Sequence, residues 1–342
     1  TSTSDAWTDD LPSGTFACQS ICTDGTSVYA VFIDTNASPD EYHIQAWDIE
    51  TWDVKSGWGS TGTQLTLASD AAVHKVIIAN SSYLAVINDT QGITVAGSAA
   101  IEIIDITDGS LDADGAGDAT TGVGDDVKAD PCIVSDGTNL FFCVYKTSTT
   151  NLYLCSATIA DPTTGSGGSN YPLNTNQNAH CGGMTGAGTG AVALLNHVSA
   201  DAHDDVVLYT FDASDADLAK IERGQNANSI VCDEYVYEDC NDMVFDGINI
   251  WAFVLIQNPT DRMALLKIDS SKLIWDEQEG GDKYLDDINP SLFLLPAGHT
   301  ALGSPQMGLT FDGRDVWSLV EHSASQTLSG KIVRLPLGLI RS

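Results

Sequence analysis

The sequence is poor in positive charge, and this shortage excludes several classes of protein. It has 14 Lys and Arg residues against 47 Asp and Glu residues, a formal net charge of −33. Such a chain repels the phosphate backbone of nucleic acids and anionic lipid headgroups, so we expect neither a nucleic-acid partner nor a membrane-surface role. No apolar stretch approaches the ~20 residues of a membrane-spanning helix, so no membrane insertion is expected either.

Glutamate is also scarce, because only nine of the 47 acidic residues are Glu and the other 38 are Asp. Aspartate and glycine, of which there are 31, favour turns and caps over helix interiors. No stretch longer than about ten residues has a convincing 3.6-residue period. The composition therefore predicts an all-β chain with many strands and many turns.

One short motif recurs along the chain. It consists of Asp-Gly, two variable residues, an aliphatic residue and an aromatic residue, and it begins at Asp24, Asp136, Asp246 and Asp312. Asp-Gly provides the positive φ of a tight hairpin turn, where the Asp carboxylate caps its own backbone. Two weaker copies, of which the second lacks both Asp-Gly and the aromatic residue, complete a series of six anchors: Tyr29, Tyr83, Phe141, Ala191, Trp251 and Trp317.

The anchors divide the chain into six units, each with three or four expected antiparallel strands. One such sheet can bury its faces only against its neighbours, so the repeat predicts a β-propeller. We predict a single six-bladed propeller over residues 1–342. Its approximate blades are 11–60, 61–118, 119–170, 171–224, 225–290 and 291–342. Residues 1–10, through Ser4–Asp10, are expected to close the ring by adding an outer strand to the last blade.

The Asp-Gly turn, the aromatic-led strand and the following strand that ends in Asp are similar to the YVTN and quinoprotein-like class of propeller repeats. This resemblance implies architecture alone, because the repeat serves many functions. The Asp-Gly-aromatic repeats, the long polar loops and the apolar segment Leu335–Ile340 also resemble, more weakly, propeller-type structural proteins of bacteriophage tails and virions. That second resemblance implies a role in assembly or attachment.

Polar residues recur where the inner strand of each unit is expected. Counting back from each turn gives Gln19, His74, Asp130, His180, Asp242 and Gln306. Inner strands line the central channel of a propeller, so these groups could hold a metal or a small ligand at its mouth. A water-filled polar channel is the alternative.

Carboxylates alternate near glycines in one segment, at Asp108, Asp112, Asp114 and Asp118. Calcium takes six to eight oxygen ligands from a flexible loop, so this segment is the best local candidate for Ca²⁺, although it does not match an EF-hand. A solvated acidic loop is the alternative.

Catalytic motifs are missing: the five Arg residues form no sialidase-type cluster, and no Gly-x-Ser-x-Gly elbow is present. We therefore expect a non-enzymatic propeller of a virion or cell surface, whose partners are proteins of an assembly or a surface glycan. One alternative is a secreted calcium-dependent hydrolase or lactonase with its site at the channel. Another is a carbohydrate-binding propeller that uses Trp47, Trp52 and Trp58, unless these residues pack between blades.

The eight cysteines include no Cys-x-x-Cys pair and no zinc-type spacing. Their even number favours disulfides and an extracellular, virion or other extracytoplasmic location. Cys232 and Cys240 bracket an acidic loop and are predicted to pair.

Cys143 and Cys155 are also predicted to pair, if a loop of three or five residues sets them opposite each other on consecutive strands. A loop of four residues would set Cys143 against Leu154 and exclude the bond. Cys132 and Cys181 are predicted to be free buried thiols.

Overall fold

The computed structural model describes residues 16–34, 41–60, 62–65, 74–88, 98–120, 127–146, 151–162, 171–174, 179–186, 191–198, 205–212, 237–256, 262–272, 291–294, 308–321 and 330–335. These residues form β-strands and one 3-10 helix, η3 (Ser270–Lys272). No helix among them has the length and hydrophobicity that crossing a bilayer requires.

The strands form six antiparallel sheets, in each of which consecutive strands are neighbours. Sheets 1 to 3 have four strands each: β1 (Phe16–Thr23), β2 (Ser27–Asp34), β3 (Glu41–Asp48) and β4 (Thr63–Gln64); β5 (His74–Ile78), β6 (Tyr83–Asn88), β7 (Ser98–Asp105) and β8 (Leu111–Thr120); β9 (Val127–Ser135), β10 (Asn139–Lys146), β11 (Asn151–Thr158) and β12 (Tyr171–Asn174).

Among the described residues, sheets 4 and 6 have three strands and sheet 5 has four. These are β13 (Ala179–Gly186), β14 (Ala191–Val198) and β15 (Asp205–Asp212); β16 (Tyr237–Phe245), β17 (Asn249–Ile256), β18 (Arg262–Asp269) and β19 (Ser291–Leu294); β20 (Leu309–Phe311), β21 (Val316–Glu321) and β22 (Gly330–Leu335).

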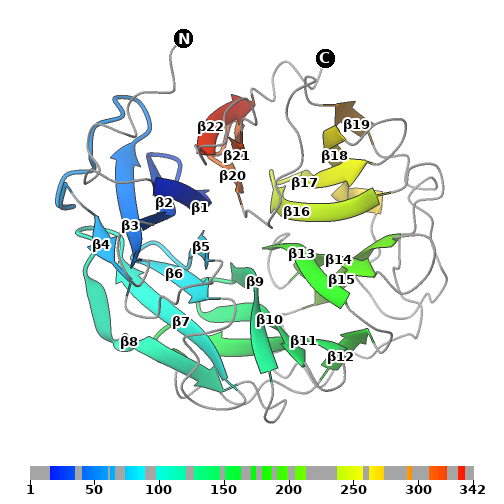
Figure 1. Cartoon of the computed structure of the whole chain (residues 1–342), viewed down its shortest axis with the longest axis horizontal. Helices are drawn as coiled ribbons and strands as arrows, with labels where there is room; N and C mark the ends of the chain where they lie inside the picture. The colour runs from blue at the N-terminus through cyan, green and yellow to red at the C-terminus, as the bar shows by residue number, and fades with distance from the viewer. Residues whose placement is uncertain are drawn as a thin grey trace.

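The first strand of each sheet lies nearest a common centre, and the sheets radiate from it (Figure 1). First strands of successive sheets contact one another in the order β1, β5, β9, β13, β16 and β20, and β20 contacts β1. The fold is a β-propeller. The all-β propeller of antiparallel sheets that the repeat predicted is therefore confirmed, whereas Ser4–Asp10 lies outside the described residues.

The hydrophobic core lies between neighbouring sheets, and β2 shows how one strand serves two interfaces. Successive side chains of a strand point to opposite faces. Val28 and Phe32 accordingly pack with Trp317 of sheet 6, while Tyr29 and Val31 pack against sheet 2. Both faces of this strand are buried, which explains its nearly continuous apolar sequence.

The cysteine predictions are corrected by the strand register. The connection between β10 and β11 has four residues, so Cys143 pairs in register with Leu154, and Phe142 pairs with Cys155. Both cysteines are buried and neither belongs to a disulfide, so the predicted Cys143–Cys155 bond is wrong.

The prediction of free thiols at Cys132 and Cys181 is also wrong, because these two residues form a disulfide between β9 and β13 with their Cα atoms 6.2 Å apart. The neighbouring first strands of sheets 3 and 4 bring them together. Cys232 lies outside the described residues, so its pairing with Cys240 stays a prediction.

Candidate functional site at the ring centre

A β-bulge interrupts four of the first strands at matching places. The register shifts fall between Cys18 and Ser20 in β1, between Cys181 and Gly183 in β13, and between Cys240 and Asp242 in β16. In β9 the shift falls between Ala129 and Ile133, which pair with Val144 and Phe142 of β10. A bulge re-aims side chains and increases the local twist. The bulges therefore decide which residues of the first strands meet at the ring centre.

Residues within or directly after these bulges join one first strand to the next. The Ser20 hydroxyl oxygen accepts a hydrogen bond from the Val76 amide of β5 (3.1 Å). Cys132 carries the disulfide to β13. Gly183 lies directly against Asp242, where an added Cβ would lie 2.9 Å from the Asp242 carbonyl carbon. The Asp242 carboxylate accepts the Leu309 amide of β20 (2.8 Å).

Asp242 also forms an ion pair with Lys75, which lies on β5 of sheet 2. Sheets 2 and 5 lie on opposite sides of the ring (Figure 1), so this pair spans its centre. The Asp242 side chain is fully buried and that of Lys75 is 6% exposed. The second carboxylate oxygen accepts the amide of Met243 (2.8 Å). Both oxygens of Asp242 are thus engaged by partners within the protein.

The polar residues expected to line a channel lie on first strands: Gln19 on β1, His74 on β5, Asp130 on β9, His180 on β13 and Asp242 on β16. Gln306 lies outside the described residues. The partner that decides the role of Asp242 is Lys75, which was not among the predicted site residues. Lys75 could have been found from the sequence, because it is a charged residue in His-Lys-Val-Ile-Ile, a segment expected to form an inner strand.

The four Asp-Gly turns use their carboxylates as predicted. One oxygen of Asp24 accepts the amides of Thr26 and Ser27 at 2.8 and 2.7 Å. The corresponding oxygens of the other three residues accept the equivalent pairs of amides: Asp136, Asp246 and Asp312. Each glycine has a φ between 88° and 93°, a left-handed conformation that favours glycine.

Three of these turns contain a second bond that the sequence did not predict, which runs from the aromatic residue to the other carboxylate oxygen. Tyr29 donates its hydroxyl to Asp24 (2.6 Å). The indoles of Trp251 and Trp317 donate to Asp246 and Asp312 at 2.8 and 2.7 Å. Phe141 has no donor, and the Asn139 amide group supplies the bond to Asp136 (3.2 Å). The Asp and the aromatic residue of the motif therefore form one unit.

These bonds set the titration of the turn carboxylates. Burial raises the pKa of Asp24 and Asp246, but hydrogen bonds from Tyr29 and Thr26 at the first, and from Asn249 and Trp251 at the second, hold each pKa below its usual value. Lys55 adds a positive charge 3.6 Å from Asp24 and also donates to Tyr29. Burial and the bond to Asp24 raise the pKa of Tyr29.

The segment proposed for calcium is largely a strand. Asp108 lies in the turn before β8 and accepts the Ser110 amide (2.9 Å), while Asp112, Asp114 and Asp118 lie on β8. Three of the four aspartates thus belong to a strand, while calcium binding by this segment stays a prediction. No group of three or more His, Cys, Asp or Glu side chains suited to a metal occurs among the described residues.

The three tryptophans considered for carbohydrate binding pack between sheets. Trp47 and Trp58 are buried. The Trp58 indole donates to the carbonyl of Ile106 in sheet 2 (3.2 Å). Trp52 lies with its ring centre 5.8 Å from that of Trp317 in sheet 6. The packing interpretation is confirmed, and these residues form no exposed platform for a sugar.

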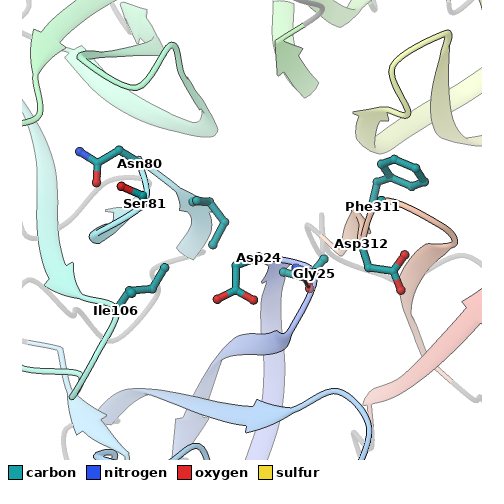
Figure 2. Close-up of a pocket in the computed structure, with 10 residues that line it drawn as sticks. Asp24, Gly25, Asn80, Ser81, Ile106, Phe311 and Asp312 are labelled. Atoms are coloured by element: carbon teal, nitrogen blue, oxygen red, sulfur yellow. Dashed lines mark hydrogen bonds between the residues drawn. The ribbon is translucent and has the colours of Figure 1, made fainter.

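A pocket of about 440 Å³ lies where the turns of sheets 1, 2 and 6 meet. We call this end of the ring the turn end. Figure 2 shows Asn80 and Ser81 on one side of the pocket, Phe311 and Asp312 on the other, and Asp24 with Gly25 between them.

No protein-family model matches the sequence, and no curated protein matches it. Solved structures do. The Hadza microbial sialidase Hz136 has a TM-score of 0.55 at 12% identity, covering 98% of this chain and 68% of that chain. The α-L-arabinanase of Penicillium chrysogenum, complexed with arabinobiose, has a TM-score of 0.51 at 10% identity, covering 95% and 97%.

The β-propeller domain of the Trilobed protease from Pyrococcus furiosus has a TM-score of 0.46 at 11% identity, covering 94% of this chain and 93% of that chain. Identities this low establish similarity of fold alone, because one fold hosts many functions.

Proposed function

We propose that this chain is a non-catalytic propeller that attaches a virion or a cell to a saccharide-bearing surface. The observation that carries the proposal is the Lys75–Asp242 ion pair. A catalytic or calcium-binding carboxylate at the ring centre needs free oxygens, and both oxygens of Asp242 are engaged by Lys75 and by two backbone amides. This central group therefore holds sheets together and is not open to a substrate.

Three further observations support attachment to a neutral surface. The net charge of −33 disfavours anionic partners. The turn carboxylates are occupied by their own turns, which leaves them a structural role. The disulfide between sheets 3 and 4 suits an extracellular or virion location, where such bonds persist.

We also propose that all six sheets are blades of one closed ring, with Ser4–Asp10 as the outer strand of sheet 6. The contact between β20 and β1 and the packing of Trp317 against sheet 1 support closure. Deletion of residues 1–10 should then expose the edge of β22 and lower the melting temperature. An unchanged melting temperature would contradict a role for this segment in closure.

A saccharide hydrolase or calcium-dependent lactonase is the second candidate. Its support is that the sialidase and the arabinanase, two solved structures with TM-scores of 0.55 and 0.51, are enzymes by name. The polar residues Gln19, His74 and Asp130 on the first strands are the groups such a site would use.

Retention on polysaccharide beads separates the two candidates. The full chain is passed over agarose, cross-linked dextran, cellulose and chitin, with and without CaCl₂, and both bound protein and released reducing ends are measured. Attachment predicts retention on at least one matrix without release of reducing ends. Release that a chelator abolishes would establish the hydrolase, and no retention on any matrix would contradict saccharide attachment.

A further inference from the structure

The pocket at the turn end has the size of a small-ligand site. Its volume of about 440 Å³ falls within the roughly 300–1,000 Å³ of small-ligand pockets. It is built from turns of three different sheets, so its shape depends on the assembled ring and not on one hairpin. The ring-centre residues Lys75 and Asp242 are not among its lining residues.

The carboxylates beside the pocket disfavour two classes of ligand. Asp24 and Asp312 repel an anion, as does the net charge of the chain. A cation is disfavoured because each Oδ1 accepts two backbone amides and each Oδ2 accepts the aromatic residue of its turn, so a cation would have to share or displace these bonds. A peptide added as a strand is also disfavoured, since the pocket is lined mainly by turns and not by an open sheet edge.

The remaining lining combines apolar and polar groups. Ile78, Ile106 and Phe311 are half-buried and present apolar surface. Ile78 and Ile106 lie with Asn80 on the sheet 2 side of the pocket, and Phe311 lies opposite them (Figure 2). The side-chain oxygen of Asn80 accepts the amides of Ser82 and Tyr83 at 2.8 and 3.0 Å, which fixes this side chain. Its Nδ2 group has no hydrogen-bond partner among the described residues, and Ser81 is exposed. Apolar walls with a few fixed polar groups are typical of sites for small polar ligands.

We propose that this pocket binds a neutral mono- or disaccharide, with apolar sugar faces against Phe311 on one side and the isoleucines on the other, and hydroxyl groups bonded to Asn80 and Ser81. The proposal rests on the attachment function above and names the site that performs it. It places recognition at the turn end, away from Gln19, His74 and the other polar residues predicted to line the channel.

Saturation-transfer NMR of the full chain with maltose, lactose, cellobiose and xylobiose tests the proposal. Ser81→Trp should fill the pocket and weaken binding at least tenfold. Asn80→Asp removes the Nδ2 donor and introduces the residue that begins the four Asp-Gly turns. The fold should therefore persist while binding weakens severalfold. Thr138→Trp is the matched control, because it places the same side chain on an exposed turn of sheet 3, outside the pocket.

Binding that survives Thr138→Trp but falls in both pocket variants, at unchanged melting temperature, is the expected result. Equal binding by wild type and Ser81→Trp would overturn the pocket assignment while bead retention still upholds attachment. Binding of sialyllactose or of Ca²⁺ alone, in place of neutral sugars, would overturn the ligand class. If beads retain nothing and no sugar binds, the attachment function itself fails.

Discussion

Two aspartate–lysine pairs of this propeller differ in burial and therefore in consequence. Asp242 and Lys75 meet at the ring centre, where their side chains are 0% and 6% exposed. Asp24 and Lys55 meet beside a turn, 3.6 Å apart, with both side chains 22% exposed. Water screens the second pair but not the first. The buried pair thus joins opposite sides of the ring, whereas the exposed pair adds little to the stability of one turn.

Removing one partner of the central pair should have the largest effect. Lys75→Met leaves Asp242 buried and uncompensated, which costs about 3–5 kcal/mol of unfolding free energy. Lys55→Met, the same substitution at the turn pair, should cost about 1 kcal/mol or less. Urea unfolding of both variants measures the difference, and equal costs would show that the central pair is not buried.

The double variant Lys75→Met/Asp242→Asn sharpens this test. It removes both charges, so it should be more stable than Lys75→Met alone. If the double variant is the less stable of the two, Asp242 stabilises the ring through its backbone bonds and not through Lys75.

The disulfide between sheets 3 and 4 should contribute about 2–4 kcal/mol. Cys132→Ser/Cys181→Ser should lower stability by this amount beyond the cost of the control variant Cys143→Ser/Cys155→Ser, which replaces two buried cysteines that form no disulfide. Peptide mapping without reduction should recover Cys132 linked to Cys181. Recovery of a Cys143–Cys155 peptide would contradict the four-residue connection between β10 and β11.

Close contact between first strands at the centre should make Gly183 sensitive to substitution. Gly183→Ala places a Cβ 2.9 Å from the backbone of Asp242 and should cost about 1–3 kcal/mol. Gly59→Ala is the control, because no atom lies within 4 Å of its added Cβ. Similar melting temperatures for the two variants would mean that β13 and β16 lie farther apart than described.

Removing an aromatic donor from one of the Asp-Gly turns should have the smallest effect on stability, and this effect should depend on pH in the acid range. The folded pKa of Asp246 lies below its usual value of about 3.9, so its stabilisation is present above that value and is lost as the pH falls through the folded pKa. Trp251→Phe removes the indole bond to Asp246 and should cost about 1.5 kcal/mol of unfolding free energy at neutral pH. The unfolding free energy of this variant should then fall less steeply as the pH is lowered. Trp58→Phe removes a bond to a neutral carbonyl and should leave the pH dependence of the unfolding free energy unchanged.

What the sequence predicts well is local. The turn carboxylates bond to amides two and three residues away, so the repeated Asp-Gly-aromatic motif was enough to predict strands, turns and a propeller. The Lys75–Asp242 pair joins residues 167 apart and the disulfide joins residues 49 apart. Bulges and the stacking of first strands decide both contacts, and neither leaves a short-range pattern. The β10–β11 register likewise depended on one residue of loop length.

A crystal structure of the chain grown with calcium is the sharpest test of the ion pair at the ring centre. We expect the Lys75 ammonium group against the Asp242 carboxylate across the ring, with the Leu309 and Met243 amides bonded to the same carboxylate and no ion at the centre. A calcium ion coordinated by Asp242, with Lys75 displaced, would contradict a structural ring centre and establish the hydrolase candidate's metal site.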